Sequence, residues 1–347
     1  MYMPHLQRAS AANRAARGAV REYYDHCWND YRILWRTDEN GSIHFGFFDP
    51  NADQPPSFLS ALKAALSTGG AIVMAIAAGL AAATGTGWGR DQAVRCLRVA
   101  ARGRASRHDR AQARMIETCA QAVDLQRGER VLDAGCGVGG TDLWLAERFD
   151  VQVVGLNIQP MHLAEARRLA LSHRAGHGVR FSMQDFTEMA IADNRFDVVW
   201  ALESACHCTD KMAFIGEAHR VLQPGGRLMV ADFFRVHDEL EDEEEKRLKI
   251  WTEGWALPNL ASVSGFQVGL ESTGFQKVVY RDIAAQVLPS SRRLYRASLV
   301  AMPINALLER TGARSATQGR NVRAAFEQYR TLRSRSWTYG IVVATKP

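Results

Sequence analysis

A glycine-rich loop follows a short apolar segment near the middle of the chain. Residues 131–140 read Val-Leu-Asp-Ala-Gly-Cys-Gly-Val-Gly-Gly, so Gly135, Gly137 and Gly140 satisfy the GxGxxG pattern. Such glycines let the backbone pass close to a bound nucleotide, and the pattern by itself also fits a dinucleotide-binding fold. Asp133, two residues before the first glycine, favours a different ligand, because a buried carboxylate repels a pyrophosphate. The same carboxylate can accept a hydrogen bond from an ammonium group.

Two further polar positions follow predicted strands. The second predicted strand ends at Asn157, whose amide offers a hydroxyl one neutral acceptor and one donor. Asp185 and Phe186 follow the third predicted strand, where an acidic side chain can accept a hydrogen bond from an adenine amino group. Together, Asp133 and Asp185 move the interpretation away from a dinucleotide-binding fold.

Glu203 and His207 are the candidate catalytic groups. They stand at the carboxyl end of the fourth predicted strand, where ligand sites open in doubly wound sheets. Either side chain can accept a proton during a reaction. Two structural alternatives stay open: His207 as a histidine with satisfied hydrogen bonds, and Glu203 as an anchor for the N-terminal region.

The N-terminal region is rich in aromatic residues that could surround a substrate. Electron-rich rings stabilise a cation without acting as bases. The candidates are Tyr24, Trp28, Tyr31, Trp35, Phe45 and Phe47. Their near-helical spacing fits a packed core equally well. Trp251 and Trp255 present the same choice between a pocket wall and the core.

The elements that position these residues form a regular alternation from residue 130 onward. Helices are expected at 141–148, 161–172 and 212–222, and strands alternate with them, which indicates a parallel sheet covered on both faces. The expected strands are 131–134, 151–156, 179–183, 196–202, 227–232, 277–283 and 337–345. Between the last two strands, residues 292–332 are expected to form a helical insertion.

Together the loop and strand ends resemble the class I methyltransferases that use S-adenosylmethionine. The resemblance implies an α/β fold, with a doubly wound, Rossmann-like sheet of seven strands whose last strand is antiparallel. It also implies S-adenosyl-L-methionine as the cofactor. Contacts to this cofactor are then expected from Asp133, Gly135, Gly137, Gly139, Asn157, Gln159, Asp185, Phe186 and Glu203.

Three stretches resemble the sterol C-24 methyltransferases and related isoprenoid C-methyltransferases. They are the aromatic region Tyr23–Phe47, the pair Gly137–Gly140 and Gly155–Asn157, and Ala201–His207, which is close to the family's fourth-strand signature. The resemblance covers residues 20–50 and 107–235. Tocopherol methyltransferases, phosphobase N-methyltransferases and cyclopropane synthases share parts of it.

The resemblance implies methyl transfer to a carbon of a hydrophobic isoprenoid or sterol-like molecule. Methylation of an alkene creates a carbocation, so Tyr24 and the other rings would stabilise it, and Glu203 or His207 would remove the proton. The alternative is N- or O-methylation of a small natural product that is tocopherol-like, alkaloid-like or a phosphobase. Such an acceptor needs only deprotonation and no aromatic cage. A binding protein that keeps a vestigial fold is a third hypothesis.

Composition limits the class of protein. The 347 residues are 47% hydrophobic and 23% charged, which excludes disordered and collagen-like chains. The six cysteines show no metal-like spacing, so we expect reduced thiols, no metal site and a cytoplasmic location. The net charge of +6 is read as solvated helix faces, and no motif indicates nucleic-acid binding. The oligomeric state is left open, with a homo-oligomer as one option.

The chain is expected to divide into an N-terminal lid, residues 1–115, and a cofactor-binding domain, residues 116–347. The lid contains an insertion at about 57–106 that a compact sterol enzyme does not need. Its segment 64–89 carries no charge, but it consists mainly of Ala and Gly, and arginines follow it. We expect peripheral membrane contact through residues 64–114, or cover for a hydrophobic substrate, rather than a transmembrane span.

Overall fold

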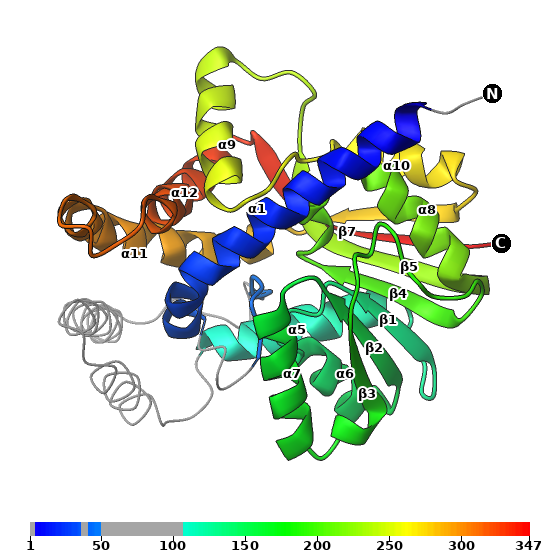
Figure 1. The fold of residues 1–347 in the computed structure, drawn as a ribbon. Coiled ribbons are helices and arrows are strands. Elements are labelled where there is room, and N and C mark those ends of the chain that lie inside the picture. The colour runs from blue at the N-terminus through cyan, green and yellow to red at the C-terminus, as the bar shows by residue number, and fades with distance from the viewer. Residues whose placement is uncertain (1–3, 36–40, 50–106) are drawn as a thin grey trace.

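The computed structural model describes residues 4–35, 41–49 and 107–347 (Figure 1). The helices of this part of the chain are α1 (Pro4–Leu34), α5 (Arg107–Ala122), α6 (Gly140–Phe149), α7 (Pro160–Ser172), α8 (Lys211–Val221), α9 (Asp242–Gly254), α10 (Val263–Ser272), α11 (Ala284–Arg310) and α12 (Ala316–Arg333). The strands are β1 (Arg130–Ala134), β2 (Gln152–Asn157), β3 (Val179–Met183), β4 (Phe196–Leu202), β5 (Leu222–Arg235), β6 (Gln276–Asp282) and β7 (Trp337–Thr345).

The strands form one seven-stranded sheet in the order β3-β2-β1-β4-β5-β7-β6. The first five strands in the chain pair in parallel, whereas β7 runs antiparallel to both β5 and β6. The predicted fold class is therefore confirmed, including the antiparallel last strand. The strand expected at 337–345 has the same bounds as β7.

Both faces of the sheet are covered, because successive strand residues point to opposite sides. On one face Val131, Val198 and Trp200 pack into a core shared with α5, α6, α9, α11 and α12. On the other face Leu132 and Val199 pack against α8 and α10. This burial on two sides explains why the central strands are almost continuously apolar.

Two elements differ from the sequence-based expectation. β5 begins at Leu222 rather than at 227, because its pairing with β4 continues across a register shift near Phe196. Gly225, with φ +79°, lets the chain turn inside the strand without ending it. The helical insertion expected at 292–332 is a pair of helices, α11 and α12, that begins at Ala284.

The helix α1 lies across the carboxyl ends of two neighbouring strands, β2 and β3. Arg21 donates a hydrogen bond to the carbonyl of Ile158 beyond β2, at 2.8 Å. Arg17 pairs with Asp185 beyond β3, with 3.3 Å between the Nε and Oδ2 atoms. Further along α1, Tyr23 donates a hydrogen bond to Asn321 of α12 at 2.9 Å, and Figure 1 shows α1 passing beside α9 and α12. The N-terminal region thus covers the edge at which doubly wound sheets bind ligands.

Several predictions about the N-terminal region concern residues that the structure does not describe. The insertion at 57–106 and its uncharged segment 64–89 lie outside the described residues, so membrane contact stays a prediction. The expected domain boundary at residues 115 and 116 falls inside α5, where Met115 and Ile116 are both buried in the sheet's core. Among the described helices, none is both long and apolar enough to cross a bilayer.

Candidate active site

A cavity opens at the carboxyl edge of the sheet, between β1, β2, β4 and α1. Most of the predicted site residues reach it, although they come from distant parts of the chain. Those that line it are Tyr24, Asp133, Gly135, Gly137, Asn157, Phe186, Glu203 and His207. Gly139, Gln159 and Asp185 are not part of the cavity wall.

Three glycines of the loop are required for different structural reasons. All have positive φ, at +124° for Gly135, +54° for Gly137 and +82° for Gly139. A Cβ on Gly139 would lie 2.7 Å from the ring of Phe181, so this glycine is required by packing against β3. A Cβ on Gly137 would meet only the Cδ1 atom of Ile43, at 3.7 Å. The space beside Gly137 is therefore open to a ligand.

Two carboxyl groups are buried beneath this loop. Asp133 is 3% exposed, and burial together with the neighbouring Asp142 holds its pKa well above the ordinary range. Burial also raises the pKa of Asp142 to about 8. Neither carboxyl oxygen of Asp142 has a hydrogen-bond partner among the described residues. Because a buried carboxyl is stabilised by a nearby cation, the Asp133 end of the cavity fits an ammonium group.

The polar groups at the ends of β2 and β3 are engaged by the protein itself. Asn157 donates from Nδ2 to the Gly137 carbonyl at 3.2 Å and accepts from the Gln159 amide at 2.8 Å. The side chain of Gln159 donates to Asp25 of α1 at 2.9 Å. Asp185, whose ion pair with α1 is described above, also accepts two hydrogen bonds from Thr187. Gln159 and Asp185 therefore hold the lid in this structure, and their predicted cofactor contacts stay predictions.

Glu203 connects the site to the N-terminal region. Its Oε1 atom accepts hydrogen bonds from the backbone amide of Phe45 at 2.7 Å and from the Tyr339 hydroxyl at 2.8 Å. Burial outweighs these two bonds and raises the pKa of Glu203 to about 8. A carboxyl with that pKa is mostly protonated at neutral pH, so it donates a proton more readily than it accepts one.

His207 has the geometry of an oriented base. Its Nδ1 atom lies 3.2 Å from the carbonyl oxygen of Ala256, an acceptor only, so this nitrogen carries the hydrogen. The Nε2 atom is then free to accept, and the Tyr24 hydroxyl lies 3.5 Å from it. Burial lowers the pKa of His207 to about 4, which keeps the ring neutral at pH 7. A neutral imidazole with its acceptor nitrogen beside the cavity can take up a proton. The same burial weakens it as a base, and the hydrogen bond to the Ala256 carbonyl, which stabilises the charged ring, offsets part of that loss.

Two further histidines in the cavity wall were missed by the sequence analysis. His162 is 2% exposed, and its ring packs 4.7 Å from Tyr24 and 4.9 Å from Trp28, measured between centroids. His44 donates from Nδ1 to the Phe45 carbonyl at 2.9 Å. The Nε2 atoms of both histidines lack a partner within the described ranges. His162 lies on the first turn after β2, so a search one helical turn beyond each strand end would have found it.

The N-terminal aromatic residues do not form a cage around the cavity. Of the six candidates, all of them described, only Tyr24 is in its wall. Trp35 and Phe45 are buried and stack on each other at 6.0 Å, and Phe47 lies under the guanidinium of Arg281. Their near-helical spacing reflects core packing, the alternative that the sequence left open. Trp251 is likewise buried in the core and 4.5 Å from Trp337.

Comparison with known proteins finds methyltransferases. The family model described as "Methyltransferase domain" matches residues 132–230. Tocopherol O-methyltransferase from Arabidopsis thaliana is 25% identical over 98% of this chain and 85% of that protein. Methyltransferase GfsG from Streptomyces halstedii is 31% identical over 55% of this chain and 68% of that protein.

The fold has similar solved structures along nearly its whole length. Geranyl diphosphate C-methyltransferase from Streptomyces coelicolor A3(2), in complex with Mg²⁺, geranyl diphosphate and S-adenosyl-L-homocysteine, has a TM-score of 0.64 and 16% identity. The alignment covers 96% of this chain and 98% of that one. This likeness extends the match in fold to the helices that surround the sheet.

Proposed function

The chain belongs to the class I S-adenosylmethionine-dependent methyltransferases, and we propose that its acceptor is a hydroxyl group on a mostly apolar small molecule, with His207 as the base. The observation that carries the proposal is the orientation of His207. Its Nδ1 hydrogen is held by the Ala256 carbonyl, while Nε2 is presented beside the cavity. The tocopherol O-methyltransferase likeness, which extends over 98% of the chain, supports a hydroxyl acceptor.

The cavity contains suitable groups for each part of S-adenosylmethionine. Asp133 would accept hydrogen bonds from the methionine ammonium, and the open space at Gly137 would admit the chain that carries it. Asn157 has remaining donor and acceptor capacity for a ribose hydroxyl. Phe186 would contact the adenine. When bound, S-adenosylmethionine supplies a methyl carbon whose bond to sulfur breaks as the bond to the acceptor oxygen forms.

The protein's part in the reaction is to place the acceptor, exclude water and receive one proton. The Tyr24 hydroxyl shows that an O–H group can reach Nε2 of His207 from the cavity side. As the acceptor oxygen is methylated, its proton would pass to Nε2, and the Ala256 carbonyl would keep the ring oriented. Glu203 would then serve to hold the lid through Phe45 rather than to act as a base.

Methyl transfer to a carbon of an isoprenoid or sterol-like molecule is the second candidate. Tyr24 favours it, because its ring lies in the cavity wall and could face a developing carbocation. The other five aromatic candidates lie outside that wall, so the cation would have little aromatic cover. A hydroxyl acceptor requires no such cover, which is why we place it first.

The test is the position of the new methyl group. The protein would be incubated with S-adenosylmethionine carrying a ¹³C methyl group and with matched phenols, alcohols and alkenes, and the products analysed by NMR. We expect a methoxyl carbon, and His207→Gln should reduce its formation by about 10²-fold or more. Binding of S-adenosylmethionine, followed by calorimetry, should be unchanged in that variant. A C-methyl product would overturn the proposal, and absence of cofactor binding would leave only the binding-protein hypothesis.

A further inference from the structure

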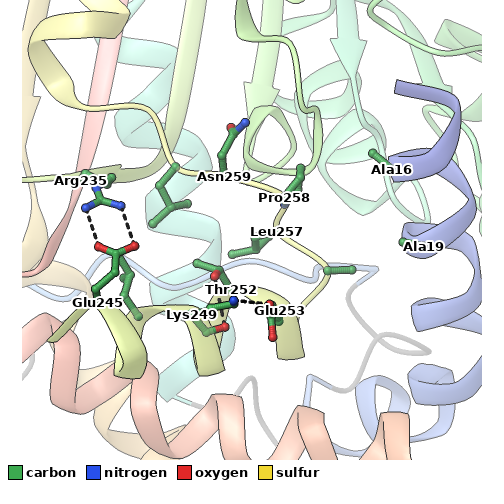
Figure 2. A pocket seen from close by; sticks show the side chains of 13 residues that line it. Ala16, Ala19, Arg235, Glu245, Lys249, Thr252, Glu253, Leu257, Pro258 and Asn259 are labelled. Carbon is green, nitrogen blue, oxygen red and sulfur yellow. Dashed lines mark hydrogen bonds and ion pairs between the residues drawn. The ribbon is translucent and has the colours of Figure 1, made fainter. Parts of the chain in front are cut away.

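A second cavity of about 510 Å³ lies between α1 and α9, outside the site described above (Figure 2). Figure 2 shows Ala16 and Ala19 on one side of it and the end of α9, with Leu257 and Pro258, on the other. The volume lies within the roughly 300–1,000 Å³ that small-molecule sites occupy. The cavity therefore has the size of a ligand site, and its walls indicate which ligand.

Seven of the thirteen residues that line this cavity are apolar, and the other six are polar or charged. The wall on α1 consists of the methyl groups of Ala16 and Ala19. These two residues are about one helical turn apart, so they face the same way. The opposite wall contributes Leu248, Leu257 and Leu260. Small residues on one wall and leucines on the other leave room for a bulky hydrocarbon.

The charged groups of this cavity are paired with each other. Arg235 and Glu245 form two hydrogen bonds, at 2.8 and 3.2 Å, and appear side by side in Figure 2. Lys249 and Glu253 are 3.6 Å apart. Because each positive group already has a carboxylate beside it, the cavity has no excess charge to attract an anion such as a diphosphate. Its electrostatics favour a neutral ligand.

The two cavities share a wall at the proposed base. Ala256 lines the second cavity, and its carbonyl oxygen is the group that orients His207 in the first. On α1, Val20 lines the first cavity and the preceding residue, Ala19, lines the second. Ala256 has φ +54°, a left-handed conformation that is strained for a non-glycine residue. Strain of this kind persists where the surroundings require one particular direction of the carbonyl group.

We infer that the second cavity binds the apolar body of the methyl acceptor, a neutral molecule of terpenoid or polyketide size. This inference rests on the proposed function, in which the acceptor's hydroxyl reaches Nε2 of His207. The hydrocarbon part of the acceptor then lies between α1 and α9, and its hydroxyl reaches the first cavity when the wall at Ala19 and Ala256 opens on binding. Substrate selection follows from the cavity: a neutral apolar molecule binds, and a charged analogue of the same shape binds weakly.

The test uses two dyes of nearly the same shape and different charge. Phenylnaphthylamine is neutral, whereas anilinonaphthalene sulfonate carries one negative charge. Each would be titrated by fluorescence into the full-length protein saturated with S-adenosylhomocysteine, so that the cofactor's part of the first cavity is occupied. We expect saturable binding of the neutral dye, at least ~10-fold tighter than binding of the sulfonate, which corresponds to about 1.4 kcal/mol.

Substitutions on both walls locate the binding. Ala16→Trp on α1 and Thr252→Trp on α9 each fill the cavity from one side. Each should weaken binding of the neutral dye by ~10-fold or more. Ala15→Trp is the matched control, because Ala15 is an exposed neighbour on the same helix and lies outside the cavity wall. If a tryptophan variant does not fold, as judged by circular dichroism, the leucine variant at that position replaces it.

The outcomes separate this inference from the proposed function. Equal binding of the neutral dye by Ala16→Trp, Thr252→Trp and the control would overturn the assignment of the cavity, and so would tighter binding of the sulfonate. Affinity for S-adenosylmethionine should be the same in all variants, since the cofactor lies in the first cavity. A C-methyl product in the NMR assay would refute the hydroxyl acceptor alone, because dye binding does not depend on which atom is methylated.

Discussion

Replacing Glu203 by glutamine should change how the stability of the protein depends on pH. The amide oxygen of Gln can still accept the hydrogen bonds from Phe45 and Tyr339, so the lid contact is kept. What the substitution removes is a titratable group whose pKa burial raises from 4.5 to about 8. The free energy of unfolding of the two proteins therefore differs by an amount that varies with pH.

The sign follows from the direction of the shift. Below pH 4.5 Glu203 is protonated in both the folded and the unfolded chain. Between that pH and about 8 the unfolded chain releases the proton and the folded chain keeps it, so wild-type stability falls as the pH rises. At about 1.4 kcal/mol for each pH unit, the loss approaches about 5 kcal/mol over the whole window. Between pH 5.5 and 7.5 it should be about 2–3 kcal/mol.

Urea denaturation at several pH values measures this difference. The other titrating groups are common to both proteins. Subtracting the wild-type free energy of unfolding from that of Glu203→Gln at each pH therefore isolates the contribution of Glu203. The variant should gain stability relative to wild type as the pH rises. Glu239→Gln, at an exposed residue, provides the baseline for losing one surface carboxyl. A difference that stays constant from pH 5 to 8 would refute the reasoning, because Glu203 would then be ionised at neutral pH and available as a base.

Other substitutions test the glycine loop and the carboxyl pair. Gly137→Ala should lower affinity for S-adenosylmethionine by calorimetry, because its Cβ would enter the open cavity, and should lower stability only by the cost of an alanine at φ +54°, about 1 kcal/mol. Gly139→Ala should lower the melting temperature further, since its Cβ would also collide with the ring of Phe181 at 2.7 Å; equal thermal effects of the two would contradict this. Asp133→Asn should weaken cofactor binding and raise thermal stability at neutral pH, because it removes one of two adjacent buried carboxyl groups. Undiminished cofactor affinity in Asp133→Asn would show that the ammonium lies elsewhere.

The family and the sheet could be predicted from local sequence patterns. The glycine loop has its conformation because glycine tolerates positive φ, and that requirement is visible in the letters alone. β7 could be located from nine successive residues, because a strand covered on both sides needs a continuous apolar run. Asp133 and Glu203 were placed at the cavity because the carboxyl ends of parallel strands meet at one edge of a sheet.

The partners of the site residues were decided by tertiary structure. Asp185 and Gln159 follow strand ends as predicted, but α1 engages both side chains, and no local pattern records which face of α1 meets them. The apolar face of an amphipathic helix shows that the helix packs against another element, but it does not show which element that is.

Tertiary structure also decided the roles of the aromatic residues and the protonation states of the site residues. Tyr24 and Trp35 belong to the same aromatic region, yet Tyr24 lines the cavity and Trp35 lies in the core. The sequence by itself determined the fold, the glycine loop and the residues at the strand ends. Only the tertiary structure decided that Glu203 is protonated and His207 neutral at pH 7, because a pKa depends on burial and on neighbours far away in the chain.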